Sequence, residues 1–186
     1  MSPSNVRNLH IFTTVSSVWA IVFGLIGPFY VVHVEKLSGG MEKLGIAFSI
    51  MIFFQSLTSY FAGRFSDRLG RRPFLFLTAY IDAIVLFLYT VIDETYQLYL
   101  LQMMLGITNG VADTISTSLL GDLTTKEKRG SAVGRFNAIV SLASAIGLAL
   151  GGYMAKIYGI EFLFYFASII VVLSTVLLLF IRESEG

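Results

Sequence analysis

The sequence predicts an all-α membrane protein of six transmembrane helices, with both termini on the cytoplasmic side. Of the 186 residues, 55% are hydrophobic and only 13% are charged, and the charged residues gather in short segments. A soluble domain usually carries about 25% charged residues. The apolar residues form six stretches joined by short connections, and a helix needs about 20 of them to span a bilayer.

The six stretches cover residues 9–34, 44–61, 74–92, 96–120, 132–155 and 160–181. Each can cross about 30 Å of hydrocarbon as a helix, some only when flanking residues are included. Strands are not expected, because a membrane barrel alternates apolar and polar residues over segments of about 10 residues, and these stretches are apolar on all faces. Together they predict a single transmembrane domain over residues 1–186.

Lysine and arginine are distributed unequally between the two sides of this arrangement. Ten lie at the N-terminus, in the second and fourth connections or at the C-terminus: Arg7, Arg64, Arg68, Arg71, Arg72, Lys126, Lys128, Arg129, Arg135 and Arg182. The other three lie in the remaining connections: Lys36, Lys43 and Lys156. Because cytoplasmic loops carry the excess of positive charge, we expect both termini to be cytoplasmic in a multi-pass protein of the cell membrane.

Several classes of protein find no support in the sequence. There is no basic face or charged tail that would suit a nucleic acid. A phosphate-cradling P-loop is absent, and no His/Glu spacing indicates a metal site. The chain has no cysteine, which removes disulfides and thiolate chemistry. We therefore expect neither an enzyme nor a cofactor.

The connection over residues 63–73 reads Gly-Arg-Phe-Ser-Asp-Arg-Leu-Gly-Arg-Arg-Pro. Gly63 and Gly70 permit a tight turn, and Asp67 and Arg71 lie one turn apart, where they can pair. This connection closely resembles the signature loop of the major facilitator superfamily, which also lies between helices two and three. The segment 121–130 resembles that family's loop after helix four, and Gly147 with Gly151 resembles its fifth-helix pattern.

The resemblance implies roles for the charged residues. In the family, the loop aspartate and arginine form a charge cluster with an acid at the end of helix four. The corresponding residues are Asp67, Arg71 and Asp122, which would form a latch that closes the cytoplasmic side in the outward-open state. The alternative is that these charges only orient the loops at the lipid headgroups.

Small residues recur on the fifth stretch. Ala143, Gly147, Gly151 and Ala155 are four residues apart, so they form one smooth ridge that another helix can approach closely. The Gly27-Pro28 pair could bend the first helix.

Two acidic residues fall inside the predicted helices, where charge costs several kcal/mol. Asp113, in the inner half of the fourth stretch, is the favoured proton-coupling residue, because burial favours the neutral form of a carboxyl group. Asp82, in the third stretch, could have the same role or could face a packed polar neighbour. At the outer end of the first stretch, His33 and Glu35 could form a proton-sensitive gate, although headgroup contact is the preferred interpretation.

Five polar or aromatic residues are candidates for substrate binding: Trp19, Gln55, Gln102, Asn109 and Asn137. Amides donate and accept hydrogen bonds, which suits hydroxyl-rich solutes, and aromatic rings can stack on sugar faces. Amides also hold helices together within membranes, and this alternative remains open for each of them.

Full transporters of the family have twelve helices in two halves of the same orientation. The resemblance therefore implies that the chain supplies one half and pairs with a copy of itself as a parallel homodimer. We expect a secondary transporter that works by alternating access on a small polar organic solute, sugar-like solutes included, with Asp113 available for proton symport.

Two alternatives remain. The first is a proton-coupled multidrug antiporter. It is weakened because Gln102 stands where such proteins usually carry arginine, and Leu148 stands where they carry proline after Gly147. The second is a non-transporting subunit, or one half of a heterodimer.

Overall fold

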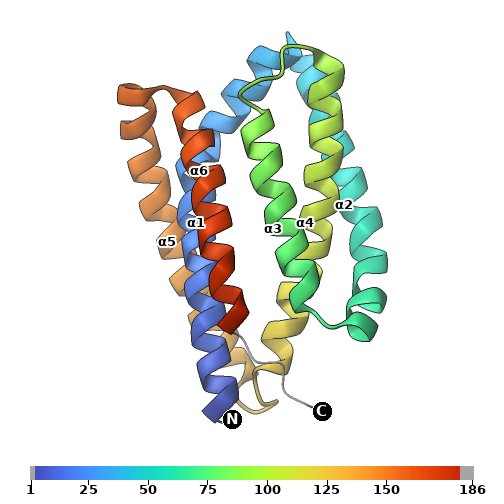
Figure 1. Ribbon diagram of the computed structural model, residues 1–186, viewed down its shortest axis with the longest axis vertical. Helices are drawn as coiled ribbons and strands as arrows, with labels where there is room; N and C mark the ends of the chain where they lie inside the picture. Colours follow the sequence, from blue (N-terminus) through green and yellow to red (C-terminus); the bar gives the residue numbers. More distant parts are fainter. Residues whose placement is uncertain (1–2, 181–186) are drawn as a thin grey trace.

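The computed structural model describes the backbone of residues 3–180, and the side chains of that range except those of residues 3 and 67–69. The described chain forms six α-helices in sequence (Figure 1): α1 (Pro3–Ser38), α2 (Met41–Leu69), α3 (Arg72–Leu88), α4 (Thr95–Asp122), α5 (Arg129–Tyr158) and α6 (Ile160–Thr175). A short 3₁₀ helix, η1 (Val176–Phe180), continues α6. The predicted all-α fold of six helices is confirmed.

The ends of the helices differ from the predicted ones for two reasons. Most helices continue past the apolar stretches, because polar residues at the membrane surface can remain helical, as at the C-terminal end of α2. In contrast, α3 stops at Leu88 rather than at residue 92. The backbone amides of Thr90 and Val91 donate to the carbonyls of Phe87 and Leu88, at 3.1 Å each, so the chain turns there.

Four helical spans of the described chain are long and apolar enough to cross a membrane: Ser4–Ser38, Met41–Ser66, Arg129–Tyr158 and Ile160–Phe180. The helix α3 has 17 residues, which is near the lower limit of about 17–25 for a spanning helix. The helix α4 has 28 residues, but Gln102, Asn109 and Asp113 interrupt its apolar character. Both helices run through the same bundle as the other four (Figure 1).

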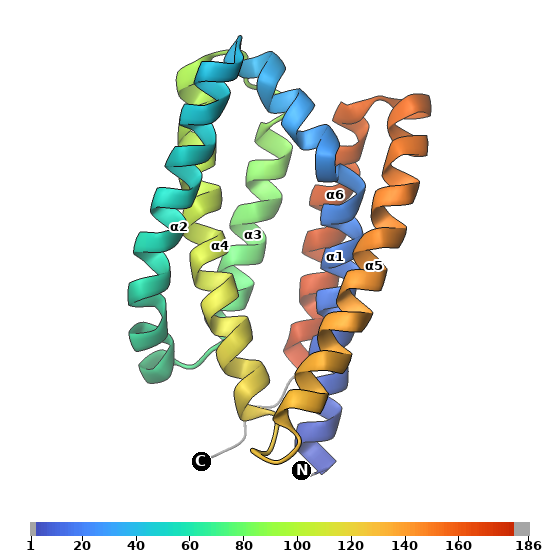
Figure 2. The ribbon, with the colours of Figure 1, turned by 180° about the vertical axis from the view of Figure 1, so that it is seen from behind.

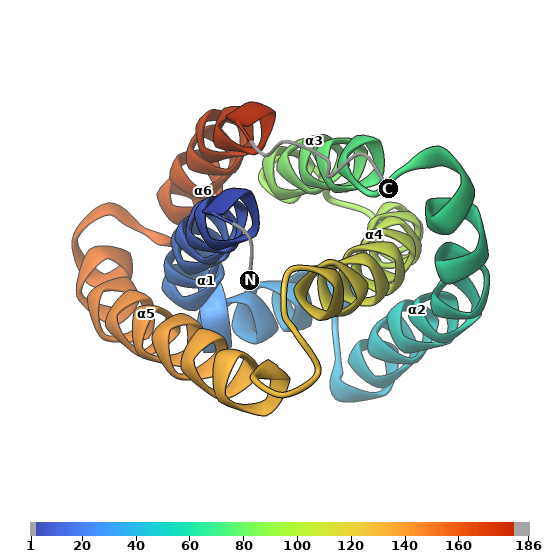
Figure 3. The same ribbon diagram turned by 90° about the horizontal axis from the view of Figure 1, so that it is seen from below.

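Seen along the bundle, α1, α3, α4 and α6 surround the centre, while α5 lies beside α1 and α2 lies beside α4 (Figure 3). The helices α2 and α5 therefore occupy opposite flanks (Figure 2). The start of α1, the end of α6 and the α2–α3 and α4–α5 connections lie at one end of the bundle. We call this the basic end, because it carries Arg64, Arg71, Lys128 and Arg135.

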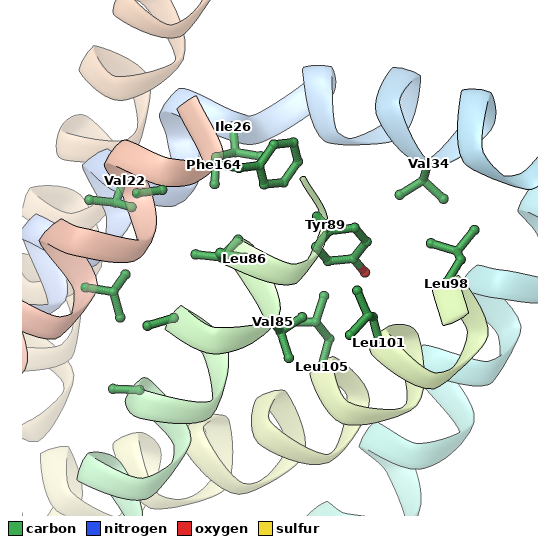
Figure 4. Packing of buried hydrophobic residues seen from close by; sticks show 14 of the residues in the cluster. Val22, Ile26, Val34, Val85, Leu86, Tyr89, Leu98, Leu101, Leu105 and Phe164 are labelled. Carbon is green, nitrogen blue, oxygen red and sulfur yellow. The ribbon is translucent and has the colours of Figure 1, made fainter. Parts of the chain in front are cut away.

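The central core is built by α1, α3, α4 and α6. Tyr89 and Phe164 are fully buried at its centre, with ring centroids 5.6 Å apart. Val22 and Ile26 of α1 surround them together with residues of α3 and α4 (Figure 4). On α5, by contrast, the buried residues are Ala143, Gly147 and Gly151. Most of the α5 surface is thus left for lipid or for another protein unit.

Glycines bring two pairs of helices into backbone contact. A Cβ atom added at Gly147 or Gly151 of α5 would clash with the backbone of α1 at Ile21 or Leu25. On α4, a Cβ atom at Gly106 would clash with the backbone of Met51 in α2, and one at Gly110 with that of Gln55. Small residues permit such close approach in membranes. The equivalence of the α1–α5 and α4–α2 pairs agrees with an inverted repeat of three helices within the unit.

The first helix is bent in its second half, as its sequence suggested. Gly27 has φ 21° and ψ −118°, which is not helical, and Pro28 follows it. Proline has no amide hydrogen to donate and its ring displaces the preceding turn. Beyond this kink, α1 leans away from α5 and toward α2 (Figure 2).

Candidate functional site

The α2–α4 pair carries the most distinctive polar contact of the predicted site. Gln55 of α2 donates a hydrogen bond from its amide nitrogen to the carboxylate of Asp113 on α4, at 3.0 Å. Asp113 is exposed in the isolated unit, so its carboxylate lies on a face that the six helices do not cover. One predicted substrate-binding residue and the favoured proton-coupling residue are therefore direct partners, held together by the close contact at Gly110.

Asp82 has a different environment. It is only 8% exposed, and its carboxylate accepts a hydrogen bond from the hydroxyl of Thr108 on α4. This is the packed polar neighbour that the sequence left open as an alternative. The hydrogen bond links α3 to α4 inside the core, away from the face that carries Asp113.

Two of the predicted substrate-binding residues point into the bundle. The indole nitrogen of Trp19 donates to the hydroxyl of Ser174 on α6, at 2.9 Å. Gln102 is fully buried, and its carbonyl oxygen accepts a hydrogen bond from Tyr30, at 3.0 Å. In this conformation both side chains join helices to one another.

The remaining two amides are more accessible. Asn109 is half-buried on α4, one turn before Asp113, and Asn137 is exposed on α5. Together with Gln55 they are the predicted substrate-binding residues that the structure leaves reachable from outside the core.

A buried polar network that the sequence analysis did not identify joins the kinked part of α1 to the core. The hydroxyls of Tyr30 and Tyr89 lie 3.1 Å apart, and Nε2 of His33 lies 2.8 Å from the carbonyl oxygen of Tyr89. His33 is 8% exposed and packs on the ring of Phe164. The preferred headgroup role for His33 is therefore wrong, because aromatic side chains enclose it. The i, i+3 spacing of Tyr30 and His33 was the available signal for their shared face.

At the basic end, Arg71 forms an ion pair with Asp122, which joins the start of α3 to the end of α4. The arginine side chain is 18% exposed and the aspartate 61% exposed. Gly70 ends α2 with φ 82°, a conformation that favours glycine. Gly63 sits against the side chain of Thr114, with room for a Cβ atom. The side chain of Asp67, the third member of the latch, lies outside the described residues.

The predicted packing ridge on α5 faces α1. Gly147 and Gly151 lie against the backbone of α1, Ala143 is buried, and Ala155 is half-buried. On the other side of the contact, Gly24 of α1 faces the backbone of Ser144. The contact thus has small residues on both helices.

Comparisons with known proteins agree with this architecture. The family model of the Major Facilitator Superfamily matches residues 12–186. A relative from Bacillus subtilis (strain 168), described as "Uncharacterized MFS-type transporter YitZ", is 26% identical over 155 residues, which cover 83% of this chain and 94% of that protein.

Other relatives are about twice as long. "Multidrug resistance protein MdtG" of Dickeya zeae (strain Ech586) is 31% identical over 95% of this chain and 45% of its own length. The protein of the same name from Proteus mirabilis (strain HI4320) is 32% identical over 87% of this chain and 42% of its own length. The chain thus spans about half the length of these curated relatives and nearly all of YitZ. Since the family model covers residues 12–186, this multi-pass membrane protein belongs to the Major Facilitator Superfamily.

Proposed function

We propose that the six-helix unit is one half of a secondary transporter, and that it pairs in parallel with an identical copy about a two-fold axis along the membrane normal. The two protomers would rock against each other to expose a shared cavity to either side in turn. The observation that carries this proposal is the Gln55–Asp113 hydrogen bond on an uncovered face. An acidic residue within a spanning helix is costly and is usually functional.

The assembly follows from the symmetry of the family. Its two halves share one membrane orientation and are related by an axis along the membrane normal, so two identical units can take the same arrangement. The length of YitZ, of which the matched region covers 94%, supports six-helix units as a recurring form. The exposed surface of α5 supports it as well, because a second unit would cover part of that surface.

We further propose that Asp113 couples transport to protons and that the cargo is a small organic solute. The carboxylate of Asp113 accepts a hydrogen bond from Gln55. A solute that carries hydroxyl or amide groups could replace either partner, since an amide both donates and accepts. Asn109, one turn before Asp113 on α4, would add a polar contact nearby, whereas Asn137 lies on α5 at the opposite flank.

Transport in proteoliposomes tests this role. In the Asp113→Asn variant, accumulation driven by a pH gradient should be lost, while exchange of solute down its own gradient should persist. The matched control is Glu161→Gln, which removes an exposed acid at the start of α6, outside the predicted site, and should accumulate solute like the wild type. Asp82→Asn tests the second candidate for proton coupling. Undiminished accumulation in Asp113→Asn would refute proton coupling through this residue.

The assembly has its own test. The purified protein in detergent should have the mass of a dimer, and cross-linking through the connections of the basic end should capture parallel protomers. A monomer in nanodiscs that transports solute would refute the dimer and leave the coupling test unaffected. A partner of different mass would indicate the heterodimer.

A second candidate keeps the mechanism and changes the cargo to amphipathic drugs, exchanged for protons. The specific observation in its favour is the name of the MdtG relatives. Gln102 counts against this candidate. It is fully buried and bonded to Tyr30, so in this conformation it cannot take the place of the arginine that drug antiporters usually carry. Uptake of sugars and efflux of cationic dyes, measured in the same vesicles, would separate the two cargo classes.

A further inference from the structure

Between the glycine contact and the basic end, α1 and α5 separate and enclose a groove of about 910 Å³. We call it the α1–α5 groove. Its lining comes from these two helices and from Lys128, which precedes α5. The helices diverge because α5 replaces the small residues of its ridge with Arg135, Phe136 and Ile139 at this end. The volume falls within the range of about 300–1,000 Å³ that ligand pockets usually have.

The charge of the groove is positive. Lys128 and Arg135 line its α5 side, and no lining residue is acidic. Among the described residues, no carboxylate pairs with Lys128 or Arg135. The helix α5 starts at Arg129 without a side-chain cap, so the positive end of its dipole adds to the field at the mouth of the groove.

The hydroxyls on the α1 side do not offer hydrogens to a ligand. Thr13, Thr14 and Ser17 donate to backbone carbonyls of their own helix at 2.7, 2.9 and 2.7 Å. They can accept hydrogen bonds but have no further hydrogen to donate. The donors that remain are the hydroxyl of Ser131, the ring of His10 and the charged groups of Lys128 and Arg135. The two charged groups favour an anion.

The far end of the groove is apolar. Val18, Ile21 and Ile139 line it toward the glycine contact. Phe136 forms part of the wall and is stacked on Phe12 of the core, with ring centroids 5.4 Å apart and an angle of 5° between the rings. The stacking fixes this wall in place. The groove is therefore positively charged at one end and apolar at the other, which suits a ligand with an anionic head and an apolar tail.

We propose that the α1–α5 groove binds an amphipathic organic anion, with its carboxylate, sulfonate or phosphate head at Lys128 and Arg135 and its apolar tail toward Ile21 and Ile139. Such a ligand can come from the solution or from the adjacent lipid leaflet, where anionic phospholipids share the same chemistry.

The position of Arg135 distinguishes a binding site from simple attachment to lipid headgroups. Arg135 comes seven positions after Lys128, which corresponds to two turns of helix and a rise of roughly 10 Å. Attachment of the protein to lipid headgroups would require positive charge only at the mouth of the groove. Arg135 instead lines the groove next to Phe136 on α5. All the lining residues belong to one six-helix unit, so binding can be measured without transport. A second unit on the exposed surface of α5 would cover part of the groove, so wild type and variants are compared in the same oligomeric state.

The single tryptophan of the chain, Trp19, follows Val18 of the groove on α1, and its indole is turned toward Ser174 of α6. A quencher in the groove would therefore lie about one helix diameter, roughly 10 Å, from the indole. The protein is placed in nanodiscs of phosphatidylcholine and titrated with dodecanoate brominated on its tail, since bromine quenches indole fluorescence at short range. Quenching should saturate for the wild type. In the Lys128→Gln/Arg135→Gln variant the half-saturating concentration should rise on the order of tenfold, because two charged donors are lost.

Two controls separate the site from general effects. The Arg64→Gln/Lys126→Gln variant removes the same charge from the basic end outside the groove and should titrate like the wild type. Dodecylammonium with the same bromine partitions into the bilayer but should not distinguish the variants. Equal curves for the groove variant and the Arg64→Gln/Lys126→Gln control would overturn the proposal, as would equal behaviour of the anion and the cation.

The source of the ligand is resolved by the lipid. If a phospholipid occupies the groove, phosphatidylglycerol in the nanodisc should compete with the added anion. It should then weaken anion binding to the wild type more than to the Lys128→Gln/Arg135→Gln variant. If both proteins respond alike to phosphatidylglycerol while the groove charges still matter, the ligand is a free amphiphile. Either result supports an anion site.

Discussion

Replacing Gly147 by alanine should weaken the contact between α1 and α5, although alanine is the better helix former. The added Cβ atom would lie 2.9 Å from the carbonyl carbon of Ile21 and closer still to its oxygen. Both are backbone atoms, so no side chain can turn aside to make room. Because the oxygen is the nearest atom, the helices must separate by about 1 Å before the Cβ reaches ordinary van der Waals contact at 3.4 Å.

The matched control is Gly134→Ala, on the same helix, where an added Cβ meets no atom within 4 Å. Both substitutions gain about 1 kcal/mol of helix propensity. Only Gly147→Ala bears the cost of overpacking, which is typically about 1–3 kcal/mol. The difference between the two variants should therefore be about 2 kcal/mol. For a chain of this size, that corresponds to roughly 4–8 °C in the midpoint of thermal unfolding.

The assay is the loss of the monodisperse gel-filtration peak after heating in nanodiscs, with all variants heated at one rate because membrane proteins unfold irreversibly. Gly151→Ala should behave like Gly147→Ala, since its Cβ would lie 2.8 Å from the carbonyl carbon of Leu25. The double variant should lose less than the sum of the two losses, because one separation of the helices relieves both clashes. Equal midpoints for Gly147→Ala and Gly134→Ala would refute the backbone contact.

Two further predictions concern polar contacts. Tyr30→Phe removes the hydroxyl that donates to the buried carbonyl oxygen of Gln102. It should lower the free energy of unfolding by about 1–3 kcal/mol. The control Tyr60→Phe, at a tyrosine that is 67% exposed, should leave the midpoint of the same melting assay unchanged. The Arg71–Asp122 pair is partly exposed, so a double-mutant cycle with Arg71→Gln and Asp122→Asn should give a coupling energy of about 0.2–1 kcal/mol. If the pair is part of a latch, spin-label distances across the basic end should widen in either single variant. Unchanged distances would show that the pair only orders the loops.

The number of helices and the α2–α3 turn were predictable because they depend on local sequence. Apolar stretches long enough to span a bilayer leave few alternatives to a helix, since every backbone polar group must be satisfied within the segment. The turn needs glycine at Gly70, whose φ of 82° disfavours other residues. Both signals lie within a few residues, so neither depends on how the helices pack.

The roles of the polar side chains were less predictable because they depend on the partner helix. Gln102 and Gln55 are both amides inside apolar stretches, yet one bonds to a buried tyrosine and the other to an uncovered carboxylate. Nearly uniform apolar helices have no polar stripe that would show which face is turned inward. The α1–α5 groove was not predictable for the same reason. In the sequence, Lys128 and Arg135 indicate only the orientation of the chain, and the groove that they line depends on how α5 packs beside α1.

The kink of α1 bears on how such a unit could move. The first half of α1 is bound to α5 through the glycine contact, while its second half is bound to α4 and α3 through Tyr30 and His33. The non-helical residue Gly27 lies between these two attachments and would be a natural hinge if either were free to slide. Bending there would break buried hydrogen bonds on one side or backbone packing on the other, and unmade buried hydrogen bonds are costly. We therefore expect the kink to fix the two helix pairs relative to each other, so that rocking takes place between six-helix units and not within one.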